Sequence, residues 1–127
     1  MHTAEQKAAD SARTSGDQGR TARFLAAIVA CAFDVPVEVV RSARRGPAPV
    51  ALTRQVAMYL AHTRLGLSFS AAGALFHRDR TTAAHACRTV EDCRDDPRFD
   101  KTLDYLERAI DVWPQLACIT DAGHDGF

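Results

Sequence analysis

Long hydrophobic segments are absent from this 127-residue sequence. The longest apolar run, residues 24–33, is far shorter than the roughly 20 residues that a membrane-spanning helix requires. The start of the chain, residues 1–21, is polar and has no secretory signal, so we expect a cytoplasmic protein without a membrane partner. No stretch alternates apolar and polar residues with a period of two, and no internal repeat is present. These absences favour an all-α fold.

Residues that could perform chemistry are also scarce. The four cysteines form no CxxC pair and no histidine cluster has metal-ligand spacing, so we expect reduced thiols, no metal and no cofactor. Asp79, His85 and Cys87 are close in sequence, but Cys87 is two positions after His85 on a helix and therefore points away from it. Because no nucleophile, base and orienting group come together, we predict that the protein is not an enzyme.

A surplus of charge of one sign is missing as well, because 16 basic and 16 acidic residues give a formal net charge of zero. The charges are nevertheless segregated along the chain. Residues 1–40 carry a net charge of −1, residues 41–90 carry +7 and residues 91–127 carry −6. The central segment contains eight arginines and a single acid, Asp79. A basic segment of this kind is typical of a nucleic-acid-binding surface.

Apolar residues recur at helical spacing through most of the chain. We predict a compact helical domain of five to six helices over residues 21–112, containing a helix-turn-helix. Residues 1–20 are rich in small polar residues and are predicted to form a disordered arm, and residues 113–127 an acidic tail. The expected helices are 21–33, a short helix that begins near Pro36, 50–65, a short helix after Ser68, one from Arg80, and 98–112, which Trp113 and Pro114 should end.

The stretch from residue 67 to residue 90 has the pattern of a short helix, a tight turn and a second helix. Gly73 lies within the first helix, where glycine costs about 1 kcal/mol relative to alanine, so we expect a close backbone crossing there. His77 and Arg78 form the turn. Asp79 is a suitable N-cap for the second helix, because its carboxylate can accept from an otherwise unpaired backbone N–H.

The second helix has two unlike faces. The inward face is apolar and consists of Ala83, Ala86 or Cys87, and Val90. The outward face consists of Arg80, Thr81, Thr82, His85 and Arg88. Arginine can donate twice to guanine, threonine can contact a thymine methyl group, and histidine can reach a base edge or a phosphate, so this face suits a DNA major groove. The alternative is a polar face in water, although adjacent threonines are poor helix formers.

A loop over residues 42–49 contains two prolines and a glycine, which exclude regular structure. It carries Arg44 and Arg45. These arginines are either simply solvated or bind a minor groove or a phosphate, an alternative that the neighbouring helix-turn-helix favours. Arg54 and Arg64 on the long helix are further candidates for contact with the DNA backbone.

Three segments combine into a more specific pattern. They are Arg54-Gln-Val-Ala-Met-Tyr-Leu-Ala61, then Leu67-Ser68, then Arg78-Asp79-Arg-Thr81-Thr82-Ala-Ala-His85-Ala-Cys-Arg88. This pattern resembles RQ-x-A-M-x-L-A, S-x-x-x-I-G-x-x-F and GGRDHTTVLHA in the DNA-binding domain of the bacterial chromosomal replication initiator, DnaA. The resemblance extends over about residues 21–110. It implies a compact helical domain that binds short boxes in replication origins.

The resemblance also implies roles for individual residues. Asp79, Thr81, Thr82 and His85 would read bases and contact phosphates, and Arg44 and Arg45 match a basic loop that reaches the minor groove. The predicted DNA-binding residues are Arg78, Asp79, Arg80, Thr81, Thr82, His85 and Arg88 at the recognition helix and turn, and Arg44, Arg45 and Arg54 at the basic loop and long helix.

The sequence departs from the family pattern in three respects. Arg80 stands where the family usually has a base-contacting histidine, which implies altered or relaxed sequence preference, or a stronger phosphate contact. The turn Phe76-His77-Arg78 is one residue shorter than the family's Phe-Gly-Gly-Arg, so a different pose of the recognition helix is expected. The 127 residues have no room for the family's ATPase domain and no GxxxxGK[ST] phosphate loop.

The sequence thus predicts a bacterial, nucleoid-associated relative of the initiator that binds double-stranded, origin-like DNA and regulates replication initiation or transcription. The alternative is an adaptor that docks on the initiator or its regulatory ATPase and binds DNA weakly or not at all. Salt dependence separates the two, because only a groove binder that uses several arginines loses affinity steeply as salt rises.

Overall fold

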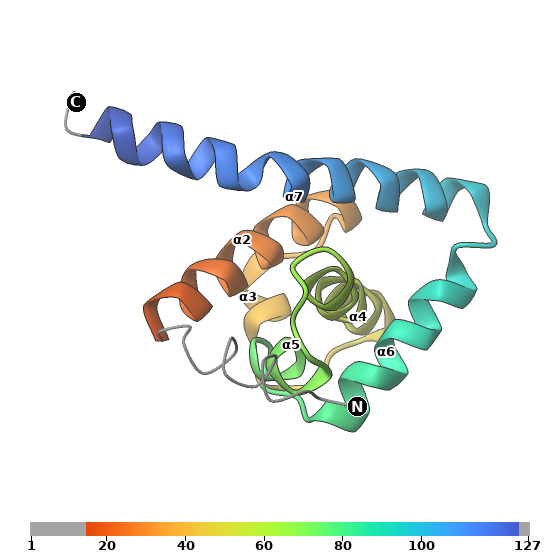
Figure 1. Ribbon diagram of the computed structural model, residues 1–127. Helices are drawn as coiled ribbons and strands as arrows, with labels where there is room; N and C mark the ends of the chain where they lie inside the picture. The colour runs from red at the N-terminus through yellow and green to blue at the C-terminus, as the bar shows by residue number, and fades with distance from the viewer. Residues whose placement is uncertain (1–14, 125–127) are drawn as a thin grey trace.

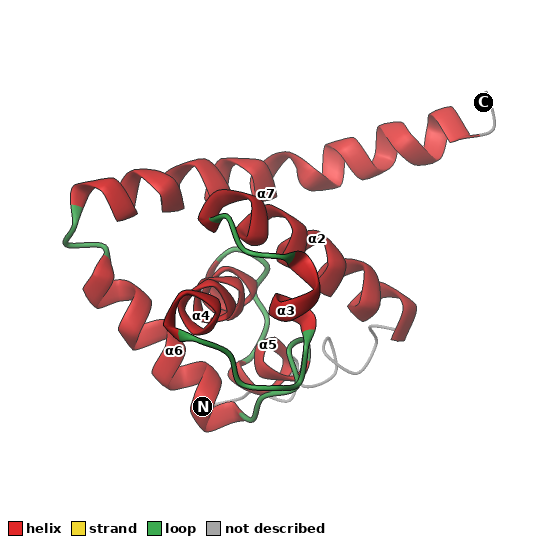
Figure 2. Ribbon diagram, turned by 180° about the vertical axis from the view of Figure 1, so that it is seen from behind, coloured by secondary structure: helices red, strands yellow, loops and turns green. Residues whose placement is uncertain are grey.

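Six α-helices and their connecting loops make up residues 15–124, the part of the chain that the computed structural model describes, with side chains placed for residues 18–113. No strand occurs among these residues, and the all-α class is confirmed (Figure 2). The expectations for residues 1–14 and 125–127 lie outside the described part. The helices are α2 (Ser15–Phe33), α3 (Val37–Arg41), α4 (Ala48–Thr63), α5 (Phe69–Ala74), α6 (Arg80–Cys93) and α7 (Pro97–His124).

Helix α4 occupies the centre of the fold, and α2, α3, α5 and α6 surround it (Figure 1). Its six consecutive residues from Val56 to Ala61 are all buried, which is the expected burial for a helix covered on every side rather than along one stripe. Thr63, the last residue of α4, is exposed. The largest fully buried side chain is Phe76, which follows α5 and fixes the turn on the core.

Helix α2 begins earlier than the sequence indicates. The prediction placed residues 1–20 in a disordered arm and started the helix at Thr21, but the helix starts at Ser15. The residues from 15 to 20 are polar and give no apolar periodicity, so the pattern does not reveal them. Once the buried stripe of Ala22, Leu25 and Val29 has formed the helix, each further residue adds one backbone hydrogen bond at little cost.

Helix α7 continues past the position where it was expected to end. Trp113 and Pro114 were predicted to stop it, but the helix runs to His124, so the predicted helix end is wrong. Trp113 stacks on Phe24 of α2 with ring centroids 4.2 Å apart and planes 7° from parallel. This contact fixes the helix immediately before the proline, where one backbone hydrogen bond is lost. The end of α7 extends beyond the rest of the molecule in both views (Figures 1 and 2).

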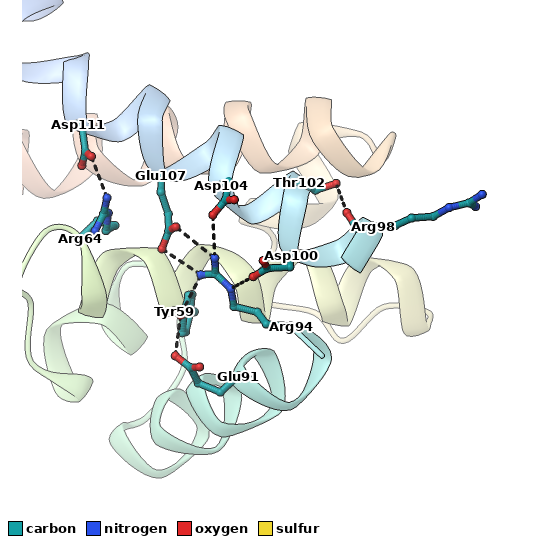
Figure 3. A network of polar contacts seen from close by, with 10 residues as sticks. All are labelled: Tyr59, Arg64, Glu91, Arg94, Arg98, Asp100, Thr102, Asp104, Glu107 and Asp111. Atoms are coloured by element: carbon teal, nitrogen blue, oxygen red, sulfur yellow. Dashed lines mark hydrogen bonds and ion pairs between the residues drawn. The ribbon is translucent and has the colours of Figure 1, made fainter. Parts of the chain in front are cut away.

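Arg94, at the end of α6, joins that helix to α7. Its guanidinium donates to Asp100 at 2.6 Å, to Asp104 at 3.1 Å and to Glu107 at 3.0 Å, all on the facing side of α7 (Figure 3). The Arg94 and Glu107 side chains are only 17% and 15% exposed, so this pair is screened less by water than the other two. The hydrogen bonds that Arg94 donates to Glu107 and then to Asp100 raise the pKa of Arg94 above its usual range and keep it charged.

Tyr59 extends the same network from α4. Its hydroxyl donates to the Glu91 carboxylate at 2.6 Å and accepts from Arg94 at 3.2 Å. Burial, together with the hydrogen bond to Glu91, raises the pKa of Tyr59 to about 12. The central helix, the recognition helix and α7 are therefore held together by one connected polar network (Figure 3).

Candidate nucleic-acid interface

The turn between α5 and α6 is formed by a close backbone contact. A Cβ atom added to Gly73 would lie 2.7 Å from the carbonyl oxygen of Arg78 and 2.8 Å from that of Asp79. Only glycine allows this approach, and the expected backbone crossing is confirmed. His77 has φ 60°, a left-handed conformation that is unfavourable for residues with a side chain. The shortened turn therefore contains no glycine and places this conformation on a histidine.

Asp79 fixes the start of the recognition helix. Its carboxylate oxygen Oδ1 accepts a hydrogen bond from the backbone N–H of Thr82 at 2.8 Å, as predicted for an N-cap. Hydrogen bonds from Thr82, and then from the Thr81 backbone, lower the pKa of Asp79 below its usual value. The carboxylate therefore stays ionised at the positive end of the α6 dipole.

Helix α6 has the two faces that the sequence predicts. Ala83, Ala86, Cys87 and Val90 are buried against α4 and α5. Arg80, Thr81, Thr82, His85 and Arg88 are all exposed. Besides the hydrogen bond from the Thr82 side chain to the Asp79 cap, these five side chains form no hydrogen bond or ion pair with another residue in the described part of the chain. The polar groups of Arg80, Thr81, His85 and Arg88 are therefore available to a ligand.

Arg78 connects the basic loop to the recognition helix. Its guanidinium donates to the carbonyl oxygens of Ala43 at 3.2 Å and Arg44 at 3.4 Å in the loop, and to those of Phe76 at 3.0 Å and His77 at 3.2 Å in the turn. Figure 2 shows the loop after α3 passing beside the turn that precedes α6. Arg78 was predicted to contact DNA, and the observed contacts give it a positioning role that the sequence did not indicate.

The basic loop itself is exposed over Arg44 and Arg45. The hydroxyl of Ser42 accepts from the backbone N–H of Arg44 at 3.1 Å, which tightens the chain at this point. Neither Arg44 nor Arg45 has an ion-pair partner among the residues with placed side chains. The loop therefore carries two uncompensated positive charges beside the start of α6.

Arg54 is placed differently from the prediction. Its side chain is 4% exposed, and its guanidinium donates to the carbonyl oxygens of Val40 at 3.1 Å and Val39 at 2.6 Å. These carbonyls lie at the end of α3, where helix geometry leaves them without partners. Burial, followed by the nearby charge of Arg78, lowers the pKa of Arg54. Arg54 is thus a structural anchor for α3, and the predicted DNA contact is contradicted by its burial.

Arg64, the other arginine suggested on α4, is exposed and pairs with Asp111 of α7 at 2.8 Å. Arginines of the described chain thus differ in whether a carboxylate neutralises them. Arg64 and Arg94 are neutralised by carboxylates of α7, whereas Arg44, Arg80 and Arg88 have no acidic partner among the described residues. The acidic C-terminal part therefore compensates the side of the domain next to it and leaves the loop and the α6 face positive.

A family model described as "Bacterial dnaA protein helix-turn-helix" matches residues 23–90, more than half of the chain. The chain belongs to this DnaA family. The match begins in α2 and ends in α6, so it includes the basic loop, the turn and the exposed face of the recognition helix. The family resemblance inferred from the sequence motifs is confirmed.

Individual DnaA proteins match the same region. The chain is 44% identical over 69 residues to the chromosomal replication initiator protein DnaA of Bordetella pertussis, and 39% identical over 67 residues to that of Lachnoclostridium phytofermentans. It is 37% identical over 79 residues to DnaA 2 of Chlamydia muridarum. These matches cover 53%, 51% and 62% of this chain but only 15%, 15% and 17% of the relatives. No solved structure matches.

Two further properties of the described residues bear on function. None of their helices combines the length and the apolar character needed to cross a bilayer. They also contain no group of three His, Cys, Asp or Glu side chains arranged to hold a metal ion.

Proposed function

We propose that this DnaA-type domain binds double-stranded DNA, with the exposed face of α6 in the major groove and the basic loop at the adjacent minor groove. The observation that carries the proposal is the exposed polar face of α6, whose N-terminal end lies beside the two uncompensated arginines of the basic loop. We further propose that binding to origin-like sites regulates replication initiation or transcription.

The geometry of the start of α6 supports base contact by its first residues. In a helix-turn-helix, the N-terminal residues of the second helix approach the base edges. Thr81, Thr82 and His85 are exposed on the first turns of α6. The Asp79 cap holds this end in one conformation, so less ordering is required on binding. Arg80 precedes them and has the length to donate to a guanine or to a phosphate.

Arg78 supports simultaneous contact with both grooves. The loop arginines and the α6 face are fixed relative to each other by its bonds to four carbonyl oxygens. A preorganised pair of contacts binds more tightly than two independent ones, because the cost of ordering the loop is already met in the free protein.

Selection of bound duplexes from a random pool, followed by fluorescence anisotropy with the selected site, tests the proposal. Thr82→Ala and His85→Ala should each weaken specific binding by about 1–3 kcal/mol. Thr102→Ala on α7 is the matched control, because Thr102 bonds only to the Arg98 carbonyl within α7 and should leave affinity unchanged. Equal affinities for wild type and both α6 variants would show that another surface reads the DNA.

The adaptor function predicted as the alternative gives a different result in the same titration. A DNA-binding domain has high affinity in dilute buffer and loses it steeply as salt rises, whereas an adaptor binds every duplex weakly or not at all, even in dilute buffer, and is recovered instead with the initiator or its regulatory ATPase. The α6 face cannot bind DNA and a protein partner at the same time, because both contacts would use the same side chains.

A further inference from the structure

A second basic feature lies where α2 meets α3. A hollow of about 530 Å³ opens there and is lined by Arg23 of α2, by Val37, Glu38 and Arg41 of α3, and by Ser42. Arg23 and Arg41 come from different helices and face the same hollow. The family resemblance assigned no DNA contact to either residue.

Both arginines are exposed and free of carboxylates. Neither forms an ion pair or a side-chain hydrogen bond with any residue whose side chain is placed. Glu38 lies three residues before Arg41 on α3, a spacing that allows a helical ion pair, but no such pair is formed. An ordinary role for Arg41 is to stabilise the carboxyl end of α3. That role does not explain why Arg23 faces the same hollow from another helix.

The hollow is continuous with the basic loop. Ser42 lines the hollow, and its hydroxyl also accepts from the Arg44 backbone at 3.1 Å. The Cα atoms of Arg41 and Arg44 are separated by three peptide units and so by at most about 11 Å. Over that length a duplex presents about six phosphates. Arg41 and Arg44 are therefore close enough to contact neighbouring phosphates of one duplex, and Arg23 lines the same hollow as Arg41.

We infer that Arg23 and Arg41 bind phosphates of the DNA that flanks the segment read by α6, on the side of the basic loop only. This inference rests on the proposed DNA binding. It adds how far the contact extends along the duplex and on which flank it does so. Glu38 at the rim opposes the contact, because its carboxylate repels a phosphate. Glu38→Gln should therefore strengthen binding to DNA that reaches the hollow.

Anisotropy titrations with duplexes of three lengths test the inference. The shortest duplex that keeps full specificity is compared with duplexes extended by one helical turn, about 10 bp, on one flank or on the other. Arg23→Gln/Arg41→Gln is compared with Arg98→Gln/Arg108→Gln, which removes the same charge from exposed positions on α7. Thermal unfolding of both variants verifies that they are folded.

The inference predicts that only one extension raises wild-type affinity, and that Arg23→Gln/Arg41→Gln abolishes this gain. At about 50 mM salt the loss should be about tenfold or more, and the slope of log K against log salt should become shallower by about two. On the shortest duplex this variant should match the α7 control. Glu38→Gln should raise affinity for the same extended duplex only.

Three results would overturn the inference. Equal losses for the two double variants on the extended duplex would show that net charge alone matters. Equal losses on short and extended duplexes would place these arginines within the box itself. A change in oligomeric state without a change in DNA affinity would assign the hollow to a protein contact. A wild-type chain that binds no duplex would instead refute the proposed function.

Discussion

Replacing Gly73 by alanine tests whether the helix-turn-helix depends on the close approach between α5 and the turn. The new Cβ atom would lie 2.7 Å and 2.8 Å from the carbonyl oxygens of Arg78 and Asp79, whereas ordinary contacts begin at 3.4 Å. Both oxygens belong to the main chain, so neither can move away by rotation of a side chain. The start of α6 therefore has to shift by about 0.7 Å to restore normal packing.

The size of the effect follows from two opposing contributions. Crowding of this kind costs about 1–3 kcal/mol, while replacing a helical glycine by alanine gains about 1 kcal/mol. Gly19 in α2 isolates the second contribution, because a Cβ atom there would meet nothing within 4 Å. Gly19→Ala should therefore stabilise the domain by up to about 1 kcal/mol, and Gly73→Ala should be less stable than Gly19→Ala by about 1–3 kcal/mol.

Urea unfolding followed by circular dichroism measures both free energies, and linear extrapolation gives the difference. Gly73→Ala should also weaken binding to the selected duplex, because it displaces the capped end of α6, whereas Gly19→Ala should not. If both variants were equally stabilised and bound DNA as wild type does, the close backbone contact would have no energetic role and the reasoning would be refuted.

Three further predictions concern the polar groups that hold the interface. Arg94→Met should lower the free energy of unfolding by about 2–3 kcal/mol, because it leaves Glu107 without its partner. Arg64→Gln, which removes the exposed pair with Asp111, should lower it by less than about 1 kcal/mol. Equal losses of unfolding free energy for the two variants in urea titrations would refute this. Tyr59→Phe should flatten the alkaline loss of stability: the raised pKa means that the contribution of Tyr59 is complete below pH 10 and is lost as pH rises towards about 12. If the difference in unfolding free energy between Tyr59→Phe and wild type stayed the same from pH 9 to pH 12, this prediction would be contradicted. Arg78→Gln should speed amide hydrogen exchange in the basic loop but not in α4. Equal exchange rates in the loop for the variant and wild type would show that Arg78 does not position the loop.

The recognition helix could be predicted closely from the sequence because its signals are local. The Asp79 cap, the apolar stripe through Ala83 and Val90, and the glycine within α5 all act over a few residues. The exposure of Thr82 and His85 follows directly from that stripe, since the opposite side of an amphipathic helix faces solvent.

The roles of the long side chains were not predictable from the sequence, because their partners are distant in the chain. Arg54 bonds to carbonyls 14 and 15 residues away, and Arg78 bonds to the loop 34 and 35 residues away. The net charge of a sequence segment gives every arginine the same weight, whereas burial in the structure distinguishes the structural Arg54 from the exposed Arg44. Composition also gave no indication that Arg94 is the centre of a network.

Helix ends were the other weak point. The polar start of α2 lacks apolar periodicity, and a proline in α7 is normally a reason to end a helix. In both cases a tertiary contact decides the outcome. The buried stripe of α2 supports the turns before it, and the stack of Trp113 on Phe24 holds α7 at the proline.

Affinity for the selected minimal duplex as a function of salt is the most direct measurement of the central claim. Contacts from Arg44, Arg45, Arg80 and Arg88 should give a slope of log K against log salt of about −3 to −4, with each arginine-to-glutamine variant making the slope shallower by about one. No measurable affinity for any duplex at about 50 mM salt, or a slope that none of the four variants changes, would contradict a DNA-binding role for this surface.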